Sequence, residues 1–220
     1  CYWVINHGIE NSYMKIIKLQ EDITSEIAKS FKDSIAIDTE ATGLQIPERD
    51  KLSLIQICDQ KDNVYIIQPN KKTYKAPNLV SVLENNKIQK IGHFLRFDKS
   101  ALEFFLKCKM NNIFDTKIAS KIVRTYTDAH GLKNLVQEFC NKNLDKRQGS
   151  SDWNKDINEL SDKQLEYAAN DVIYLHKIKA QLEKMLIREK RFDLYKRCIN
   201  FLDTRVELDQ TGFKFDIFEH

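Results

Sequence analysis

The first half of the chain carries short apolar runs separated by polar turns, and this pattern predicts strands with helices between them. Alternating or short apolar runs predict strands at residues 15–19, 34–41, 52–59, 63–69 and 87–94. Apolar residues at helical spacing predict helices at residues 22–32, 77–85 and 97–107. We interpret the first of these strands as an edge strand of the resulting sheet.

The second half of the chain is mostly helical. The predicted helices lie near residues 115–125, 131–140, 162–187 and 189–202. Ser161, followed by Gln164, forms a capping-box signal at the start of the third helix. Trp153 lies in the polar loop 141–160, and we expect it to anchor that loop to the core, with stacking on a base as the alternative.

Along the chain, predicted strands come first and predicted helices then dominate. This order predicts one α/β domain. We expect a mixed central sheet flanked by helices, with a helical C-terminal half. The length of 220 residues fits one sizeable domain. We assign this domain to residues 14–220, because Met14 begins the first strand-and-helix unit, and residues 1–13 are left as an N-terminal extension of unassigned role.

The composition argues against several classes of protein. The net charge of +3, with acids and bases interspersed, is smaller than the basic excess of a dedicated duplex binder, and it fits a small substrate or a short strand better. The five cysteines form no CxxC pair, which argues against a structural zinc site or a disulfide framework. Neither a bilayer-spanning run nor a secretory signal pattern is present. We therefore expect a cytoplasmic protein with no membrane partner.

Asp38 and Glu40 stand near the end of the predicted strand 34–41. Side chains two positions apart on a strand point to the same face, and two carboxylates on one face of an apolar strand are costly unless a cation neutralises them. Oxygen ligands of this kind are those that Mg²⁺ prefers. The pair alone is a common pattern, however, and a solvated strand end explains it better.

Further acids lie at two places after this strand. Tyr167 and Asp171 stand at i and i+4 of a predicted helix, on a side that is otherwise small and apolar. An Asp at the rim of the core, bonded to Tyr167, is the structural alternative. Asp98 follows the strand 87–94 at its junction with a helix, where an Asp often serves only the helix N-terminus. The ordered combination of all these signals is more specific than any one of them.

This ordered set of residues resembles the DEDDy branch of the DEDD exonuclease superfamily. Its members are Asp38, Glu40, Asp98, Tyr167 and Asp171. Its flanks resemble ribonuclease D in FDTKIASKI (114–122), GLKNLVQEF (131–139), LDKRQGSSDW (144–153) and LSDKQLEYAANDVIYL (160–175). They resemble nanoRNase C, the short single-domain relative of ribonuclease D, in AIDTEATGL (36–44), HFLRFDKSAL (93–102) and FLDTRVELDQTGF (201–213). The resemblance runs from Met14 to the end and implies an RNase H-like fold.

The resemblance also implies a mechanism in which four acids hold two divalent ions, Mg²⁺ or Mn²⁺. Asp38 would bridge both ions, Glu40 and Asp171 would complete the site of the ion that carries the nucleophile, and Asp98 would bind the second ion, partly through water. Tyr167 would orient the attacking water and not take its proton, because a neutral phenol is a poor base. The product would be a nucleoside 5'-monophosphate.

Several residues are candidates for contact with the substrate. Leu44 matches an apolar wedge between the last two bases, or it is a core leucine after a turn. His93 could approach the scissile region or the terminal ribose, or it is a half-buried structural histidine. Candidates for binding a 5'-phosphate are Arg124, Tyr126, His130 and Lys133. For each of them taken singly, a solvated loop before a helix is the better explanation.

The expected function is a 3'→5' exoribonuclease acting on short single-stranded RNA, down to dinucleotides. The alternatives are tRNA 3' trimming in the manner of ribonuclease D, hydrolysis of single-stranded DNA 3' ends, and a non-catalytic nucleic-acid-binding module. Full-length ribonuclease D carries helical domains after the nuclease, for which a chain ending at residue 220 leaves no room. C-terminal aromatic residues and the resemblance imply a ring-like homo-oligomer, with a tail folded back on its own subunit as the competing account.

Overall fold

The computed structural model describes the backbone of residues 4–9, 12–43, 45, 49–144, 151–213 and 215–219, and side chains from Met14 onward within these ranges. In this part of the chain, seven strands form one sheet in the order β1-β2-β5-β4-β3-β6-β7. The strands are β1 (Val4–Ile9), β2 (Ser12–Gln20), β3 (Ser34–Ala41), β4 (Leu52–Cys58), β5 (Asn63–Gln68), β6 (Gln89–Gly92) and β7 (Ile113–Asp115). The pairs β2–β5, β3–β6 and β6–β7 are parallel and the other neighbours are antiparallel. The predicted mixed sheet is therefore confirmed.

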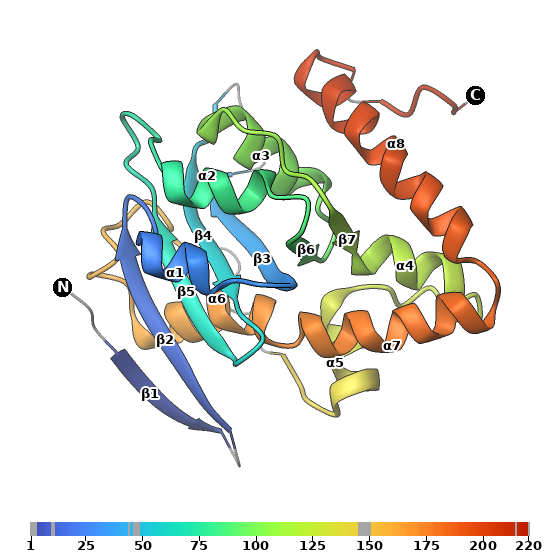
Figure 1. Ribbon diagram of the computed structural model, residues 1–220, viewed down its shortest axis with the longest axis horizontal. Coiled ribbons are helices and arrows are strands. Elements are labelled where there is room, and N and C mark those ends of the chain that lie inside the picture. The colour runs from blue at the N-terminus through green and yellow to red at the C-terminus, as the bar shows by residue number, and fades with distance from the viewer. Residues whose placement is uncertain are drawn as a thin grey trace.

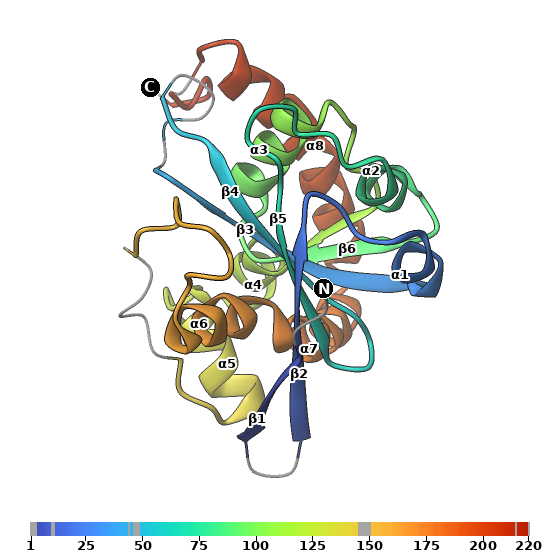
Figure 2. The ribbon, with the colours of Figure 1, turned by 90° about the vertical axis from the view of Figure 1, so that its left-hand side faces the viewer.

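Helices cover both faces of this sheet (Figures 1 and 2). They are α1 (Ser25–Ser30), α2 (Pro77–Glu84), α3 (Arg96–Leu106), α4 (Thr116–Val123), α5 (Leu132–Cys140), α6 (Asp162–Ile173), α7 (Leu175–Arg188) and α8 (Phe192–Gln210). On one face α6 packs on β3, β4 and β5, and α7 packs against α4 and α5. The other face is covered by α1, α2 and α3, and α8 contacts α3, α4, α7 and β7. No helix in the described ranges combines the length and the hydropathy needed to cross a membrane.

The buried strand β3 separates the two halves of the core. Ala36 packs into the apolar cluster on the α6 side, and Ile35 and Ile37 pack into the cluster on the α2 and α3 side. Strand alternation then assigns Asp38 to the α6 face with Ala36. The register between β3 and β4 shifts just after Glu40, and such bulges commonly re-aim side chains beside active sites.

The structure corrects three of the predicted elements. β2 is not an edge strand, because β1, which lies in the N-terminal extension, pairs with it in antiparallel register. The single helix predicted at 162–187 is two helices that meet at Tyr174. The apolar periodicity hid this break because Val172 and Leu175, on either side of it, are buried in the same cluster. β7 was not predicted, since three residues carry too little pattern.

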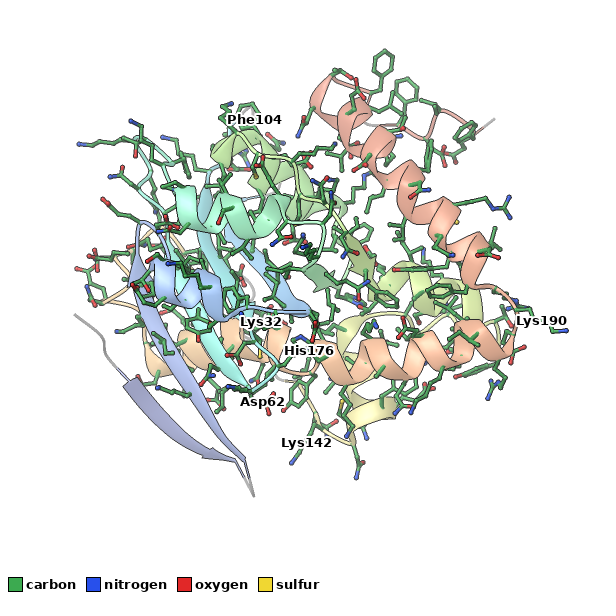
Figure 3. All side chains as sticks on the ribbon, viewed as in Figure 1. Lys32, Asp62, Phe104, Lys142, His176 and Lys190 are labelled. Atoms are coloured by element: carbon green, nitrogen blue, oxygen red, sulfur yellow. The ribbon has the colours of Figure 1, made fainter. Side chains whose placement is uncertain are left out.

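Two local sequence signals in the second half of the chain, the capping box at Ser161 and the aromatic Trp153, gave correct predictions. The capping box is present, with Ser161 Oγ accepting from the Gln164 backbone N–H at 3.3 Å. Trp153 is only 3% exposed, so it anchors its loop to the core as expected. Some charged side chains point outward, for example Lys190 in the turn between α7 and α8 (Figure 3).

The turn from β6 into α3 lies tightly against β3. A Cβ atom at Gly92 would lie 2.1 Å from Leu95 Cδ2 and 3.1 Å from the Ile37 carbonyl oxygen, so glycine is required there by close packing. α3 begins four residues later and carries Asp98 in its first turn. The packing at Gly92 therefore fixes where Asp98 can lie.

The buried carboxylate of Asp115 holds the same turn from the other side. It accepts hydrogen bonds from the backbone N–H groups of Phe94 (3.3 Å) and Leu95 (2.7 Å). It also caps α4 by accepting from the N–H groups of Lys117 and Ile118. Asp115 thus links the start of α3 to α4 and caps α4.

We predict that Gly92→Ala destabilises the protein by about 1–3 kcal/mol, because the added methyl group overlaps Leu95. Leu95→Ala alone should cost about 2–5 kcal/mol through a cavity. In the double variant the smaller side chain at 95 makes room for the methyl group, so the combined loss in urea unfolding should be clearly less than the sum. Additive losses would contradict the proposed overlap.

Candidate active site

Three carboxylates from two distant segments meet on the α6 face of the sheet. One oxygen each from Asp38, Glu40 and Asp171 lies within 4.8 Å of the others. Asp38 and Glu40 come from the end of β3, and Asp171 comes from the last turns of α6, which packs directly on β3. The same-face spacing of the strand pair and the position of Asp171 on its helix each had a structural explanation, and it was the resemblance to the DEDDy exonucleases that implied their convergence.

Asp98 reaches the same strand from the first turn of α3. It is 4% exposed, and Thr39 Oγ1 donates a hydrogen bond of 2.6 Å to its Oδ1. Thr39 lies between the two acids of β3, so this bond ties Asp98 to the strand that carries them. Asp98 is not among the three oxygens that share the closest group, but its charge acts on Asp38.

The electrostatics of these acids are those of a repulsive cluster in which Asp98 is buried and the other three acids are half-buried. Burial raises the pKa of Asp38 well above its ordinary value, and the charges of Asp98, Asp171 and Glu40 raise it further. Burial, followed by the charges of Asp171 and Asp98, raises the pKa of Glu40 to about 9. Burial raises the pKa of Asp98 to about 6, although its bond from Thr39 opposes this rise. Without cations, the cluster therefore holds protons near neutral pH.

Tyr167 lies beside this cluster on α6. Burial, and then the charges of Asp171 and Glu40, raise the pKa of its phenol above the ordinary value. The phenol is therefore protonated at all physiological pH values and can donate a hydrogen bond. Its ring lies 6.0 Å from the ring of buried Trp153, so the loop 151–160 supports the phenol from one side.

His93 and Leu44 are two of the residues expected to contact the substrate. His93 Nδ1 lies 2.9 Å from Thr116 Oγ1, which donates its own hydrogen to the Gly92 carbonyl oxygen at 3.0 Å. Nδ1 is therefore the donor in this pair, and in the neutral ring Nε2 is an acceptor. The substrate role of His93 stays a prediction. Leu44 lies outside the described residues.

The four residues expected to bind a 5'-phosphate lie around the turn between α4 and α5. Arg124 is 2% exposed and pairs with Glu138, and it donates to the Ala129 carbonyl oxygen at 2.7 Å. Tyr126 is 67% exposed and its hydroxyl donates to Glu138 Oε1 at 2.7 Å. His130 Nδ1 lies 2.9 Å from Ser120 Oγ.

Lys133 completes this group and is exposed near the start of α5. The buried guanidinium of Arg124 therefore serves the local structure here, whereas Tyr126 and Lys133 are accessible to a ligand. The phosphate-binding role of all four stays a prediction.

A second group of ionisable side chains lies apart from the acidic cluster. His176 near the start of α7 is close to Asp62 in the turn between β4 and β5 (Figure 3). Burial lowers the pKa of His176, and the charges of Asp62 and Asp59 oppose this shift. This group lies toward Ser34, at the opposite end of β3 from Glu40.

Sequence reasoning missed two residues of the site. Thr39 stands between the two acids of β3, and alternation alone placed it on the far face, away from them. Gln56 stands directly opposite Asp38 in the register of β3 and β4. The sequence signal for Gln56 was its polar side chain inside the apolar run 52–58. Only the pairing of β4 with β3 shows that this side chain lies beside Asp38.

The donor set fits a hard divalent cation. The three carboxylates are half-buried and close together, and oxygen ligands of this kind are those that Mg²⁺ and Mn²⁺ prefer. The charges that act on Asp38 and Glu40 from the described residues are all those of other acids. An α/β domain with such a cluster at one strand end, and a neutral phenol beside it, is the arrangement of a metal-dependent phosphodiester hydrolase.

Comparison with known proteins agrees with this class. The chain matches the 3'-5' exonuclease family over residues 13–187. The solved structure of Brucella melitensis NrnC is 44% identical, with a TM-score of 0.87, and the match covers 93% of this chain and 98% of that one. The same protein has been solved with bound Mg²⁺ and bound to pGG.

Curated relatives include longer proteins. Ribonuclease D of Haemophilus influenzae is 35% identical over 159 residues, which cover 71% of this chain and 38% of that protein. DNA polymerase I of Aquifex aeolicus is 33% identical over 153 residues, which cover 68% of this chain and 24% of that protein. The chain thus spans less than half the length of these relatives. It belongs to the 3'-5' exonuclease family, and the RNase H-like fold implied by its sequence is confirmed.

We predict that stabilisation by Mn²⁺ increases with pH. A raised pKa means that the metal-free protein keeps the full stability of the protonated cluster below pH 4.5, the ordinary value for Glu40, and loses it as the pH rises through about 9. Cations bind the ionised form and relieve the repulsion. At a hundred-fold excess over Kd, metal should add about 2.7 kcal/mol. This corresponds to roughly 5–10 °C in Tm for a chain of this size.

The measurement is a thermal melt with and without Mn²⁺ between pH 6 and pH 9, with EDTA in the metal-free samples. The gain from metal should be smallest at pH 6. A gain that does not change across this range would contradict the electrostatic account of the cluster.

Proposed function

We propose that this protein is a metal-dependent 3'→5' exoribonuclease that removes nucleoside 5'-monophosphates from short RNA, including dinucleotides. The observation that carries the proposal is the convergence of Asp38, Glu40 and Asp171 within 4.8 Å, with Asp98 bound to the intervening Thr39. These are the four acids of the family pattern, and Tyr167 stands beside them.

The four acids would hold the divalent ions, Mg²⁺ or Mn²⁺, with two ions as the proposed number. Bound ions would supply a water of lowered pKa and would stabilise the charge that develops on the leaving oxygen. The charges of Asp98, Asp171 and Glu40 all act on Asp38, which suits a ligand shared by both ions. The hydrogen bond from Thr39 holds Asp98 on one side of the Asp38 and Glu40 pair.

Tyr167 would orient the attacking water. Its raised pKa keeps the hydroxyl protonated, so it can donate to or position a water but cannot serve as the base. The contact with Trp153 restricts the ring to one side of the acidic cluster. Positioning within a few tenths of an ångström is the contribution that such a residue makes to catalysis.

Short RNA is the proposed substrate because of the whole-length similarity to Brucella NrnC, which has been solved bound to pGG. Ribonuclease D, by contrast, is matched over less than half of its length. Near-neutral charge also favours a short strand over a large structured RNA. Hydrolysis of single-stranded DNA ends is the second candidate, since nothing among the sequence motifs excludes deoxyribose.

The C-terminal segment is the proposed site of self-association. It folds back along α8, where Arg205 donates to the Phe215 carbonyl oxygen at 3.1 Å and the ring of Phe218 lies 5.7 Å from that of Phe201 (Figure 1). Even so, Phe215 is 63% exposed and Phe218 is 76% exposed. This apolar surface, which we call the C-terminal aromatic surface, consists of Phe201, Phe213, Phe215, Ile217 and Phe218.

A hollow of about 480 Å³ borders the C-terminal aromatic surface and gives a second copy a place to pack. Phe94, Leu194 and Phe201 line it, with arginines at its rim. Exposed aromatics next to a concave apolar site are typical of subunit interfaces. We therefore propose a homo-oligomer in which this surface of each copy is covered by its neighbour, in the cytoplasm.

The proposed activity predicts how short substrates disappear. In a time course on 5'-labelled RNA of two to ten nucleotides with Mg²⁺, long species should shorten from the 3' end and dinucleotides should be consumed rapidly. Asp171→Asn should remain folded and lose activity at least about 100-fold, since loss of a supporting group around a metal already costs 10–100-fold.

The matched control is Glu166→Gln, which neutralises an acid on the same helix whose charge acts on Tyr174 and not on the cluster. This variant should keep its activity. Substantial Mg²⁺-dependent cleavage by Asp171→Asn would overturn the site, and accumulation of dinucleotides would overturn the substrate. A DNA strand of the same sequence tests the second candidate.

The self-association proposal predicts a mass above the 25.9 kDa of one chain in light scattering. Phe215→Ser combined with Phe218→Ser should lower that mass, because it removes the most exposed rings of the C-terminal aromatic surface. Ile187→Ser is the control: Ile187 is 62% exposed, on α7, outside this surface. An unchanged mass in the double variant would contradict the proposed interface.

A further inference from the structure

Gln56 lies at the centre of the sheet, directly opposite a metal-ligand candidate. It is 0% exposed, and the strand register pairs it with Asp38 on β3 and with Ile66 on β5. Residues directly opposite one another in an antiparallel pair point to the same face, with Cβ atoms about 4.5–5.5 Å apart. The Gln56 amide therefore lies under α6, on the face that carries Asp38 and Glu40.

Both ends of this amide lack a hydrogen-bond partner among the residues that the structure describes. Neither Nε2 nor Oε1 is bonded, and both are buried. A buried amide without partners costs about 1–3 kcal/mol. An apolar side chain of the same size would avoid this cost, since the other cross-strand neighbour, Ile66, is apolar. The amide is thus unexplained by the stability of the metal-free fold.

One cross-strand neighbour of Gln56 can supply the missing partner. The side chain of Asp38 is the hydrogen-bonding group opposite it, and an ionised carboxylate is a strong acceptor for an amide N–H. A carboxylate that holds a cation is deprotonated, so in the metal-loaded protein Asp38 offers an acceptor to this amide.

We infer that Gln56 is a positioning residue that donates from its carboxamide to the Asp38 carboxylate once the cluster holds divalent cations. This inference rests on the proposed function. The amide acts through Asp38: it fixes the plane of a carboxylate whose oxygens must face the cations. Groups that orient metal ligands in this way typically change metal affinity by 10–100-fold.

The test is Gln56→Met, which keeps an unbranched side chain of similar size and removes the polar atoms. The metal-free variant should melt at or above the temperature of the parent protein, because an unpartnered amide is lost. The Mn²⁺ concentration that gives half of the maximal thermal shift should rise by about 10–100-fold. At saturating Mn²⁺, KM for RNA should be unchanged and kcat should largely recover.

Ile66→Val is the matched control, because it alters the packing on the other side of Gln56 and leaves the amide in place. It should cost about 0.5–1.5 kcal/mol and leave the half-saturating Mn²⁺ concentration unchanged.

Two results would overturn the inference. A metal-free Gln56→Met protein that melts well below the parent, or fails to fold, would mean that the amide already has a structural partner. A variant with the parent's Mn²⁺ affinity would mean that the amide does not support Asp38. Failure of the proposed function is distinguishable, because the parent protein itself would then show no Mn²⁺-dependent thermal shift or no cleavage of RNA.

Discussion

Repulsion between clustered, half-buried carboxylates is the constraint around which this domain is organised. One carboxylate oxygen each of Asp38, Glu40 and Asp171 lies within 4.8 Å of the others, and Asp98 adds its charge from α3. Burial amplifies this repulsion, because the protein interior screens charge much less than water does. The cluster is therefore unstable as a set of anions and stable either with protons or with cations. This dependence couples the fold to metal and to pH.

The rest of the fold brings these acids together and limits their movement. Apolar residues of β3 pack into the core on both faces of the sheet, and its two carboxylates lie half-buried beside them. The packing of Gly92 against β3 and the four backbone N–H groups bound by Asp115 set the start of α3, and hence the place of Asp98. α6 lies directly on the sheet and carries Asp171 and Tyr167 on one face. A rigid frame of this kind is what allows like charges to be held a few ångströms apart.

The sequence was informative where a local pattern has one physical meaning. The D-x-E spacing on a strand, the i and i+4 spacing on a helix and the Ser161 capping box all predicted geometry that the structure contains. It failed where the same pattern fits two structures. Apolar periodicity continued through Tyr174, so one helix was predicted where α6 and α7 stand. The strand β1 and the three-residue β7 carried no pattern that could be separated from a loop.

The sequence by itself established the order of the candidate acids and the elements that carry them, because strand and helix periodicities fix which side chains share a face. The assignment of these acids to one site came from the family resemblance. Only the tertiary structure decided which distant groups meet. Thr39 bonds Asp98 although the two are far apart in sequence, Gln56 stands opposite Asp38, and Arg124 is buried against Glu138. Strand register and helix packing make these contacts, and neither can be read from one segment alone, since each depends on a partner elsewhere in the chain.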